Sequence, residues 1–369
     1  MTQPKITQHQ LFCLLCLFFL GGISYIGGSN EAGRDSWLSF LLGALLFLPV
    51  LLCTLALVRG ESTVPGVFRR AAGKWGGRLL CLFYGLTAIY VAAVSMSVFI
   101  QFISETALLA TPRVILALLM ALTVAFMLRS GLPALGRFGE MVLPVVVCFV
   151  FIAIAVTLPQ CDFRALLPLA RNPQSLFYGT WTALLLPYAE CFFPILALCT
   201  GLRDHKERVR GSLGAVLFAA LTLCSVFIKN LAALDFHAVT SYYFPSYAVA
   251  SLVSLGEFFQ RFEIFVAINF LFCQLCKTAL CLLFAQKALA PLLRCPERLA
   301  AAPLALTSAN LALLLFRSEM ELFAWLGLYK FFLTPALVIL PPLLLAARAL
   351  RDRRSAPRKP RKKAPAGPG

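Results

Sequence analysis

The sequence predicts an all-α integral membrane protein with about ten transmembrane helices, and three observations support this class. Of the 369 residues, 60% are hydrophobic and only 13% are charged, and the mean hydropathy is +0.85. A chain this apolar has too little polar surface to stay folded in water. Spans of roughly 20 residues with short connections account for its whole length. The basic residues also alternate between successive connections, as they do in proteins that cross a membrane many times.

Ten apolar segments of suitable length follow one another along the chain. They are residues 10–28, 37–58, 79–103, 112–129, 139–158, 177–200, 212–233, 257–289, 301–316 and 322–347. We therefore expect a transmembrane domain over residues 1–347 and a basic, disordered cytoplasmic tail over residues 348–369. The residues before the first span lack the charged region and the cleavage site of a signal peptide, so we expect that span to be retained.

The net charge of +17 does not indicate a nucleic-acid partner, because the basic residues are distributed over alternate connections. With the N-terminus inside, 24 of the 33 Lys and Arg residues fall in cytoplasmic segments, five in outer segments and four within spans. Nine of them lie in the last 22 residues, where we expect contact with anionic lipids. This bias predicts that both termini lie on the cytoplasmic side.

The first span ends in a glycine-rich stretch that disfavours a continuous helix. Each glycine inside a helix costs about 1 kcal/mol relative to alanine. A membrane helix is interrupted only where its freed backbone groups face protein, water or a ligand, and transporters use such interruptions to bind substrates and ions. The alternative is a glycine face that allows close helix packing. The residues concerned are Gly21, Gly22, Ser24, Tyr25, Gly27 and Gly28.

A second interruption is predicted in the sixth span, within the segment LLLPYAECFFPILAL. Pro187 and Pro194 each remove a backbone donor and disfavour a helical conformation in the preceding residue. Glu190 stands between them, and a carboxylate inside a membrane span marks either a functional site or a structural ion pair. Interruptions at corresponding positions of spans one and six are the pattern of a transporter fold built from two inverted repeats of five helices.

The eighth span carries charged residues whose roles the sequence leaves open. Glu257 and Arg261 share a helix face and can form an interfacial ion pair, while Glu263 lies on another side of the helix. Lys277 lies about five turns further along the helix than the Glu257–Arg261 pair. Its side chain either extends to the cytoplasmic surface or supplies a fixed positive charge where related transporters bind a sodium ion between the first and eighth helices. Lys330 in the tenth span has no partner that the sequence identifies.

We expect neither a cofactor nor a metal centre nor an enzymatic activity. The CxxC pairs Cys13–Cys16 and Cys273–Cys276 are not accompanied by a further Cys or His pair that would complete a metal site. Most of the 13 cysteines lie in apolar runs, where cysteine behaves as a small hydrophobic residue. The three histidines do not accompany a candidate nucleophile, and no phosphate-binding loop or G-x-S-x-G motif is present in the sequence.

Four motifs in register resemble the spore germination receptor B subunits, which belong to the amino acid–polyamine–organocation transporter superfamily. An Ile-Thr-x-x-Gln run at residues 6–10 precedes the glycine-rich break, and Ala-Gly-x-Asp-Ser-Trp at residues 32–37 opens the second span. GRFGEMVLPVVV (136–147) and EFFQRFEIFVAI (257–268) resemble the beginnings of the family's fifth and eighth spans. The resemblance covers about residues 5–347. The chain departs from the family in SYIGGSN after the first break and in the aromatic residues of PYAECFFP.

The resemblance implies a nutrient-receptor subunit in the inner membrane of a bacterial spore. Such a subunit binds a small nutrient, often an amino acid, and triggers germination together with an A-type membrane subunit and a C-type lipoprotein subunit. Backbone amides near residues 21–24 would bind the ligand carboxylate. Carbonyls near residues 25–27, with Glu190, would bind its ammonium group. The expected pocket residues are Gly21, Gly22, Ser24, Tyr25 and Gly27 of the first span, Tyr90 of the third, and Tyr188, Glu190 and Phe192 of the sixth.

Two other functions are compatible with the same sequence. A secondary transporter of an amino acid or amine would have the same fold and the same pocket. A channel subunit would use the glycine-rich break to line a path for water and ions.

Overall fold

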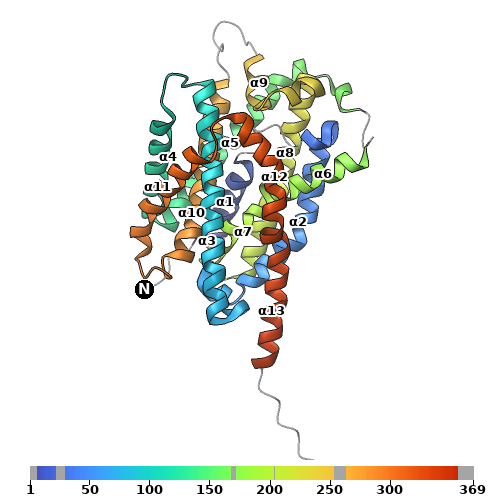
Figure 1. Cartoon of the computed structure of the whole chain (residues 1–369). Helices are drawn as coiled ribbons and strands as arrows, with labels where there is room; N and C mark the ends of the chain where they lie inside the picture. The colour runs from blue at the N-terminus through green and yellow to red at the C-terminus, as the bar shows by residue number, and fades with distance from the viewer. Residues whose placement is uncertain (1–5, 22–29, 168–171, 203, 253–262, 356–369) are drawn as a thin grey trace, which may run out of the picture.

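The chain forms a bundle of long helices that stand side by side (Figure 1). The computed structural model describes residues 6–21, 30–167, 172–202, 204–252 and 263–355. Over these ranges the regular structure is entirely helical. The principal helices are α1 (Gln8–Leu20), α2 (Ser36–Val58), α3 (Val64–Thr106), α4 (Arg113–Ser130), α5 (Leu132–Thr157), α6 (Pro173–Ala183), α7 (Phe192–Cys199), α8 (His205–Ser241), α9 (Pro245–Leu252), α10 (Glu263–Leu289), α11 (Glu297–Leu315), α12 (Glu319–Thr334) and α13 (Leu340–Ser355).

The predicted all-α fold with its order of spans is confirmed. Within the described ranges, nine helical segments are long and apolar enough to cross a membrane, and they correspond in order to the second through tenth predicted spans. The first predicted span corresponds to α1, a shorter apolar helix of 13 residues. The remainder of that span, from residue 22, lies outside the described residues.

Two connections contain more helix than the sequence predicts. Helix α3 begins at Val64 rather than near residue 79, so the basic segment before the predicted span is also helical, with a kink at Gly73. Gly73 has a φ of 81°, a left-handed conformation in which only glycine avoids a steric cost. Helix α8 continues to Ser241 and is followed by the short helix α9. The connection between the seventh and eighth predicted spans is therefore mostly helical over residues 234–252.

The boundary predicted at residue 347 is wrong, because α13 continues to Ser355. Arg348, assigned from the sequence to the disordered tail, is buried and hydrogen-bonds backbone carbonyls at the end of α2. It donates to the oxygens of Leu57 and Arg59, each at 2.6 Å, and to Ala56 at 3.1 Å. The last carbonyls of a helix have no hydrogen-bond donor within that helix. The Arg348 guanidinium supplies donors to these carbonyls at the end of α2. Residues 356–369 lie outside the described part of the chain.

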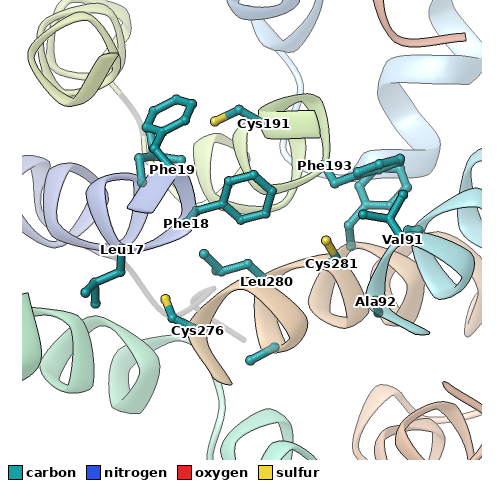
Figure 2. Packing of buried hydrophobic residues seen from close by; sticks show 14 of the residues in the cluster. Leu17, Phe18, Phe19, Val91, Ala92, Cys191, Phe193, Cys276, Leu280 and Cys281 are labelled. Carbon is teal, nitrogen blue, oxygen red and sulfur yellow. The ribbon is translucent and has the colours of Figure 1, made fainter. Parts of the chain in front are cut away.

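Helices α1 and α10 and the α6–α7 segment occupy the centre of the bundle. The buried share of the most apolar stretch is 83% in Pro173–Cys199 and 78% in α10. The corresponding share in α11 is 28%. Helix α1 is apolar around its whole circumference, which is expected of a helix surrounded by protein. Figure 2 shows Phe18 of α1 lying between Cys191, just before α7, and Leu280 of α10.

Two of the sequence motifs contact each other at the beginning of α1. Thr7 and Gln10 form a capping box, in which each side chain accepts a hydrogen bond from the other residue's backbone N–H. The Gln10 amide also donates to Glu140 of α5 at 3.1 Å. A Cβ atom at Gly136 would lie 2.8 Å from the Gln10 side chain, so α5 approaches α1 closely only because this residue is glycine. The Ile-Thr-x-x-Gln and Gly-Glu motifs thus fix one contact between the first and fifth spans.

The hydrogen bonds of Arg348 predict a measurable contribution to stability. We expect Arg348→Met to lower the free energy of unfolding by about 1–3 kcal/mol, because hydrogen bonds to charged groups contribute roughly that much and three carbonyls lose a donor. Chemical unfolding of the detergent-solubilised chain measures the effect. Arg353→Met, at an exposed position of the same helix, is the matched control and should change stability by less than about 0.5 kcal/mol. Equal stability of the two variants would contradict this role of Arg348.

Candidate functional site

The sixth span is interrupted near its middle, as predicted. Helix α6 ends at Ala183 and is followed by a wide turn, η4 (Leu184–Tyr188), and a tight turn, η5 (Ala189–Cys191), before α7 begins. Leu186 leaves the helical conformation, with a φ of −106° and a ψ of 108°. It directly precedes Pro187, whose ring disfavours a helical conformation in the residue before it. The interruption places Glu190 in the interior of the bundle.

Glu190 forms an ion pair with Lys277 of α10. The Glu190 Oε2 atom lies 2.8 Å from the Lys277 Nζ atom. Glu190 is 1% exposed and Lys277 is 7% exposed, so neither charge is in contact with bulk solvent. Two such charges are tolerated inside a membrane protein because each compensates the other. Lys277 therefore points across the bundle to the broken span rather than to the cytoplasmic surface.

A tyrosine holds the second oxygen of this carboxylate. The Tyr329 hydroxyl of α12 donates to Glu190 Oε1 at 2.5 Å. The Tyr329 ring stacks on Tyr90 of α3 with centroids 6.2 Å apart, and the Tyr90 hydroxyl accepts a hydrogen bond from the Trp325 indole. The third and tenth spans thus orient Glu190 through a chain of aromatic side chains.

The end of α1 lies against the same part of α10. A Cβ atom at Gly21 would be 2.9 Å from the backbone oxygen of Cys273 and 3.1 Å from the Lys277 Cβ atom, so no larger residue fits without displacement. The Lys277 ammonium group also lies 5.7 Å from the centroid of the Phe18 ring, within the range of a cation–π interaction. Helix α1 ends at Leu20, immediately before this contact. The first, sixth and eighth spans therefore meet around one charge pair.

Tyr188 and Phe192 flank Glu190 in the sequence but contact different surroundings. Tyr188 is buried between Phe19 of α1 and Phe47 of α2, with ring centroids 5.6 Å and 6.0 Å away. Its hydroxyl has no hydrogen-bond partner among the residues that the structure describes. Phe192 packs on Tyr84 of α3, with a centroid distance of 4.7 Å, and belongs to an aromatic cluster at the beginning of α7. Tyr188 is thus the neighbour of Glu190 that retains a free polar group.

Lys330, for which the sequence identifies no partner, forms a second ion pair between separate spans. Its ammonium group contacts both carboxylate oxygens of Glu31, in the turn η1 (Asn30–Asp35), and lies 3.2 Å from the Thr182 hydroxyl. Gly33 in the same turn has a φ of 62°, which explains the glycine of the motif that opens the second span. The ion pair connects the start of the second span to spans six and ten.

Of the expected site residues, the structure brings together Gly21, Tyr90, Tyr188 and Glu190, with Lys277 from the eighth span. Glu263 is the first residue of α10, about four turns from Lys277. Sequence reasoning missed Tyr329. The features of the sequence that could have drawn attention to it are its position next to Lys330 and its distance of four residues from Trp325. The expected residues that lie outside the described ranges are Gly22, Ser24, Tyr25, Gly27, Glu257 and Arg261.

Fold and site together define a multi-pass membrane protein of the inverted-repeat transporter type, with a charge pair at the interruption of its sixth span. A family model for spore germination proteins matches residues 5–319, and the chain belongs to this family.

The chain is also similar to a curated relative in sequence and to a solved structure in fold. The chain is 24% identical over 274 residues to spore germination protein KB of Bacillus subtilis (strain 168), and the match covers 72% of each protein. A similar fold occurs in the crystal structure of MhsT in complex with L-phenylalanine, with a TM-score of 0.67 and 13% identity. That similarity covers 94% of this chain and 89% of MhsT.

Removing one charge of the Glu190–Lys277 pair should destabilise the protein more than removing both. We expect Glu190→Gln or Lys277→Met alone to cost about 3–5 kcal/mol, because the remaining charge is buried without compensation. The double variant should recover at least half of that loss. Unfolding in detergent measures the three values, with Glu207→Gln at an exposed site as the control. Additive losses in the double variant would show that the two charges do not interact.

Proposed function

We propose that this protein is the nutrient-binding subunit of a spore germination receptor and that it binds its ligand at the Glu190–Lys277 pair. The observation that carries the proposal is this ion pair, buried at the interruption of a membrane span. Charged residues in such a position are costly and are found mainly where ions or substrates bind. Membership of the spore germination protein family supports the link to germination.

The charge pair favours a ligand that carries both a positive and a negative charge. An amino acid can place its ammonium group on the Glu190 carboxylate and its carboxylate on the Lys277 ammonium, so each buried charge stays compensated. The Tyr188 hydroxyl and the backbone groups freed by the interruption offer further hydrogen bonds. The complex of MhsT with L-phenylalanine shows that this fold accommodates an amino acid. We therefore expect the nutrient to be an amino acid or another small zwitterion.

Binding would change the arrangement of the helices because it separates the two charges. The direct contact of 2.8 Å between Glu190 and Lys277 ties α10 to the broken span. A ligand placed between the two side chains lengthens this connection and favours an arrangement in which α1 and α10 lie further from the sixth span. Such a ligand shifts an existing equilibrium by the difference of its affinities for the two arrangements. This shift is the signal that the receptor would transmit.

The signal requires other components and a defined membrane. We infer that the protein lies in the inner membrane of the spore with both termini on the core side, because the basic residues concentrate in the segments expected inside. We further infer that it assembles with an A-type membrane subunit and a C-type lipoprotein subunit, as implied by the family resemblance. Copurification of the three chains from spore membranes would test this assembly.

Substitution of Gly21 tests the placement of the ligand site. We expect Gly21→Leu to weaken the binding of radiolabelled amino acid at least tenfold, because the added side chain displaces the end of α1 from Cys273 and Lys277. Scintillation proximity binding to the purified chain gives the affinity. Gly327→Leu is the matched control, since a Cβ atom there has no neighbour within 4 Å. Unchanged affinity in a correctly folded Gly21→Leu variant would contradict the placement.

Secondary transport is the second candidate function, and the interrupted sixth span favours it because transporters bind their substrates at such breaks. Uptake of the radiolabelled ligand into proteoliposomes separates the two functions. A receptor subunit is expected to bind the ligand without accumulating it inside the vesicles. Accumulation above the equilibrium level under a proton or sodium gradient would identify a transporter instead.

A further inference from the structure

Lys229 is a third buried lysine, in addition to Lys277 and Lys330. Lys229 is on α8, close to the outer connection whose Asp162 N–H donates to the Ala232 oxygen of the same helix at 2.8 Å. Lys229 is 6% exposed. Within the described residues no carboxylate lies within 4.0 Å of its ammonium group. Lys229 therefore differs from Lys277 and Lys330, which both have acidic partners.

Lys229 is one of the residues that line a small cavity between α5, α8, α9 and α10. Figure 1 shows α5, α8 and α9 in the upper part of the bundle. The cavity has a volume of about 30 Å³. Roughly 10–15 Å³ suffices for one water molecule, so the space admits a single small ion or one or two waters. Its polar lining consists of Lys229, Ser246 and Asn269, and the other walls are apolar.

The amide of Asn269 is available to a guest in this cavity. Asn269 is 3% exposed, and its Nδ2 atom donates to the Val146 oxygen at 3.4 Å. An amide nitrogen carries two N–H groups, so one remains for a further acceptor. The Oδ1 atom is buried and has no partner among the described residues. On the opposite wall, the Ser246 hydroxyl accepts a hydrogen bond from Asn230 at 2.9 Å.

The thiol beside Lys229 does not supply a negative charge. The Cys161 Sγ atom donates to the Thr157 oxygen at 3.4 Å and lies 4.0 Å from the Lys229 backbone oxygen. Burial raises the pKa of the Cys161 thiol, and the nearby Lys229 charge only partly opposes this. The thiol is therefore protonated at neutral pH. A buried ammonium group without an anionic partner must either lose its proton or bind an anion.

We propose that Lys229 and Asn269 form a binding site for a small monovalent anion of halide size. The ammonium group compensates the charge of the anion and the free N–H of Asn269 donates a hydrogen bond to it. Water would fill the same space without compensating the charge. The site joins the outer connection, α8 and α10, so the bound anion strengthens the packing of these elements. It is separate from the proposed nutrient site and does not depend on it.

The test is the thermal stability of the full chain in nanodiscs as a function of the anion. At equal ionic strength, the unfolding temperature should be several degrees higher in sodium chloride than in sodium gluconate. The reason is that a ligand that binds only the folded state stabilises it. The difference should reach saturation as the chloride concentration rises. Bromide should replace chloride, whereas sulfate should not. Crystals grown in bromide should show an anomalous peak within hydrogen-bond distance of Lys229 Nζ.

Two variants separate this site from a general salt effect. Lys229→Met is expected to abolish the difference between chloride and gluconate. Lys206→Met, at an exposed position of the same helix, should retain it in full. Equal stability of the unmodified chain in all anions, or the same chloride effect in Lys229→Met, would overturn the proposal in favour of a water-filled cavity and a neutral lysine.

Discussion

The ion pair between Glu190 and Lys277 is the interaction on which the arrangement of this bundle depends. Each side chain alone would place an uncompensated charge inside a membrane protein, at a cost of several kcal/mol. The pair brings the charges to 2.8 Å, and the Tyr329 hydroxyl occupies the other carboxylate oxygen. The sixth span is interrupted directly before Glu190, at the place where the pair forms. The interruption of the helix and the buried ion pair are therefore parts of one site.

Several other features position this pair. The turn Ala189–Cys191 contacts the π-helical turn Pro335–Ile339 of the tenth span, so the interruption of the sixth span lies against a widened turn of the tenth. Gly21 allows the end of α1 to approach α10 beside Lys277. Lys330 joins Glu31 and Thr182. The site is thus assembled from spans that are remote in sequence, and movement of one of them would affect the others through the charges.

Much of the fold could be predicted from the sequence because the membrane imposes strong constraints. Hydrophobic segments and the distribution of basic residues gave the order of the spans, and Pro187 with Glu190 identified the broken span. Boundaries were less accurate, since the helix that contains Arg348 is extended by contacts with carbonyls of α2 nearly 300 residues away.

The partners of the site could be predicted less well. A lysine in an apolar span can extend to the surface or pair in the interior, and only the fold distinguishes these outcomes for Lys277. Tyr329 is one of nine tyrosines, and its sequence neighbourhood does not reveal that it contacts Glu190. Likewise, Glu31 and Lys330 are 299 residues apart, so their pairing follows from tertiary structure alone.

The central claim is that the charge pair recognises both charges of a zwitterion. The most direct measurement compares, by calorimetry on the purified chain, the affinities for an amino acid, for the amine that lacks its carboxylate and for the acid that lacks its ammonium group. Each analogue leaves one of the buried charges without its partner, so the account predicts that the amino acid binds at least tenfold more tightly than either. Equal affinities for all three compounds would contradict it.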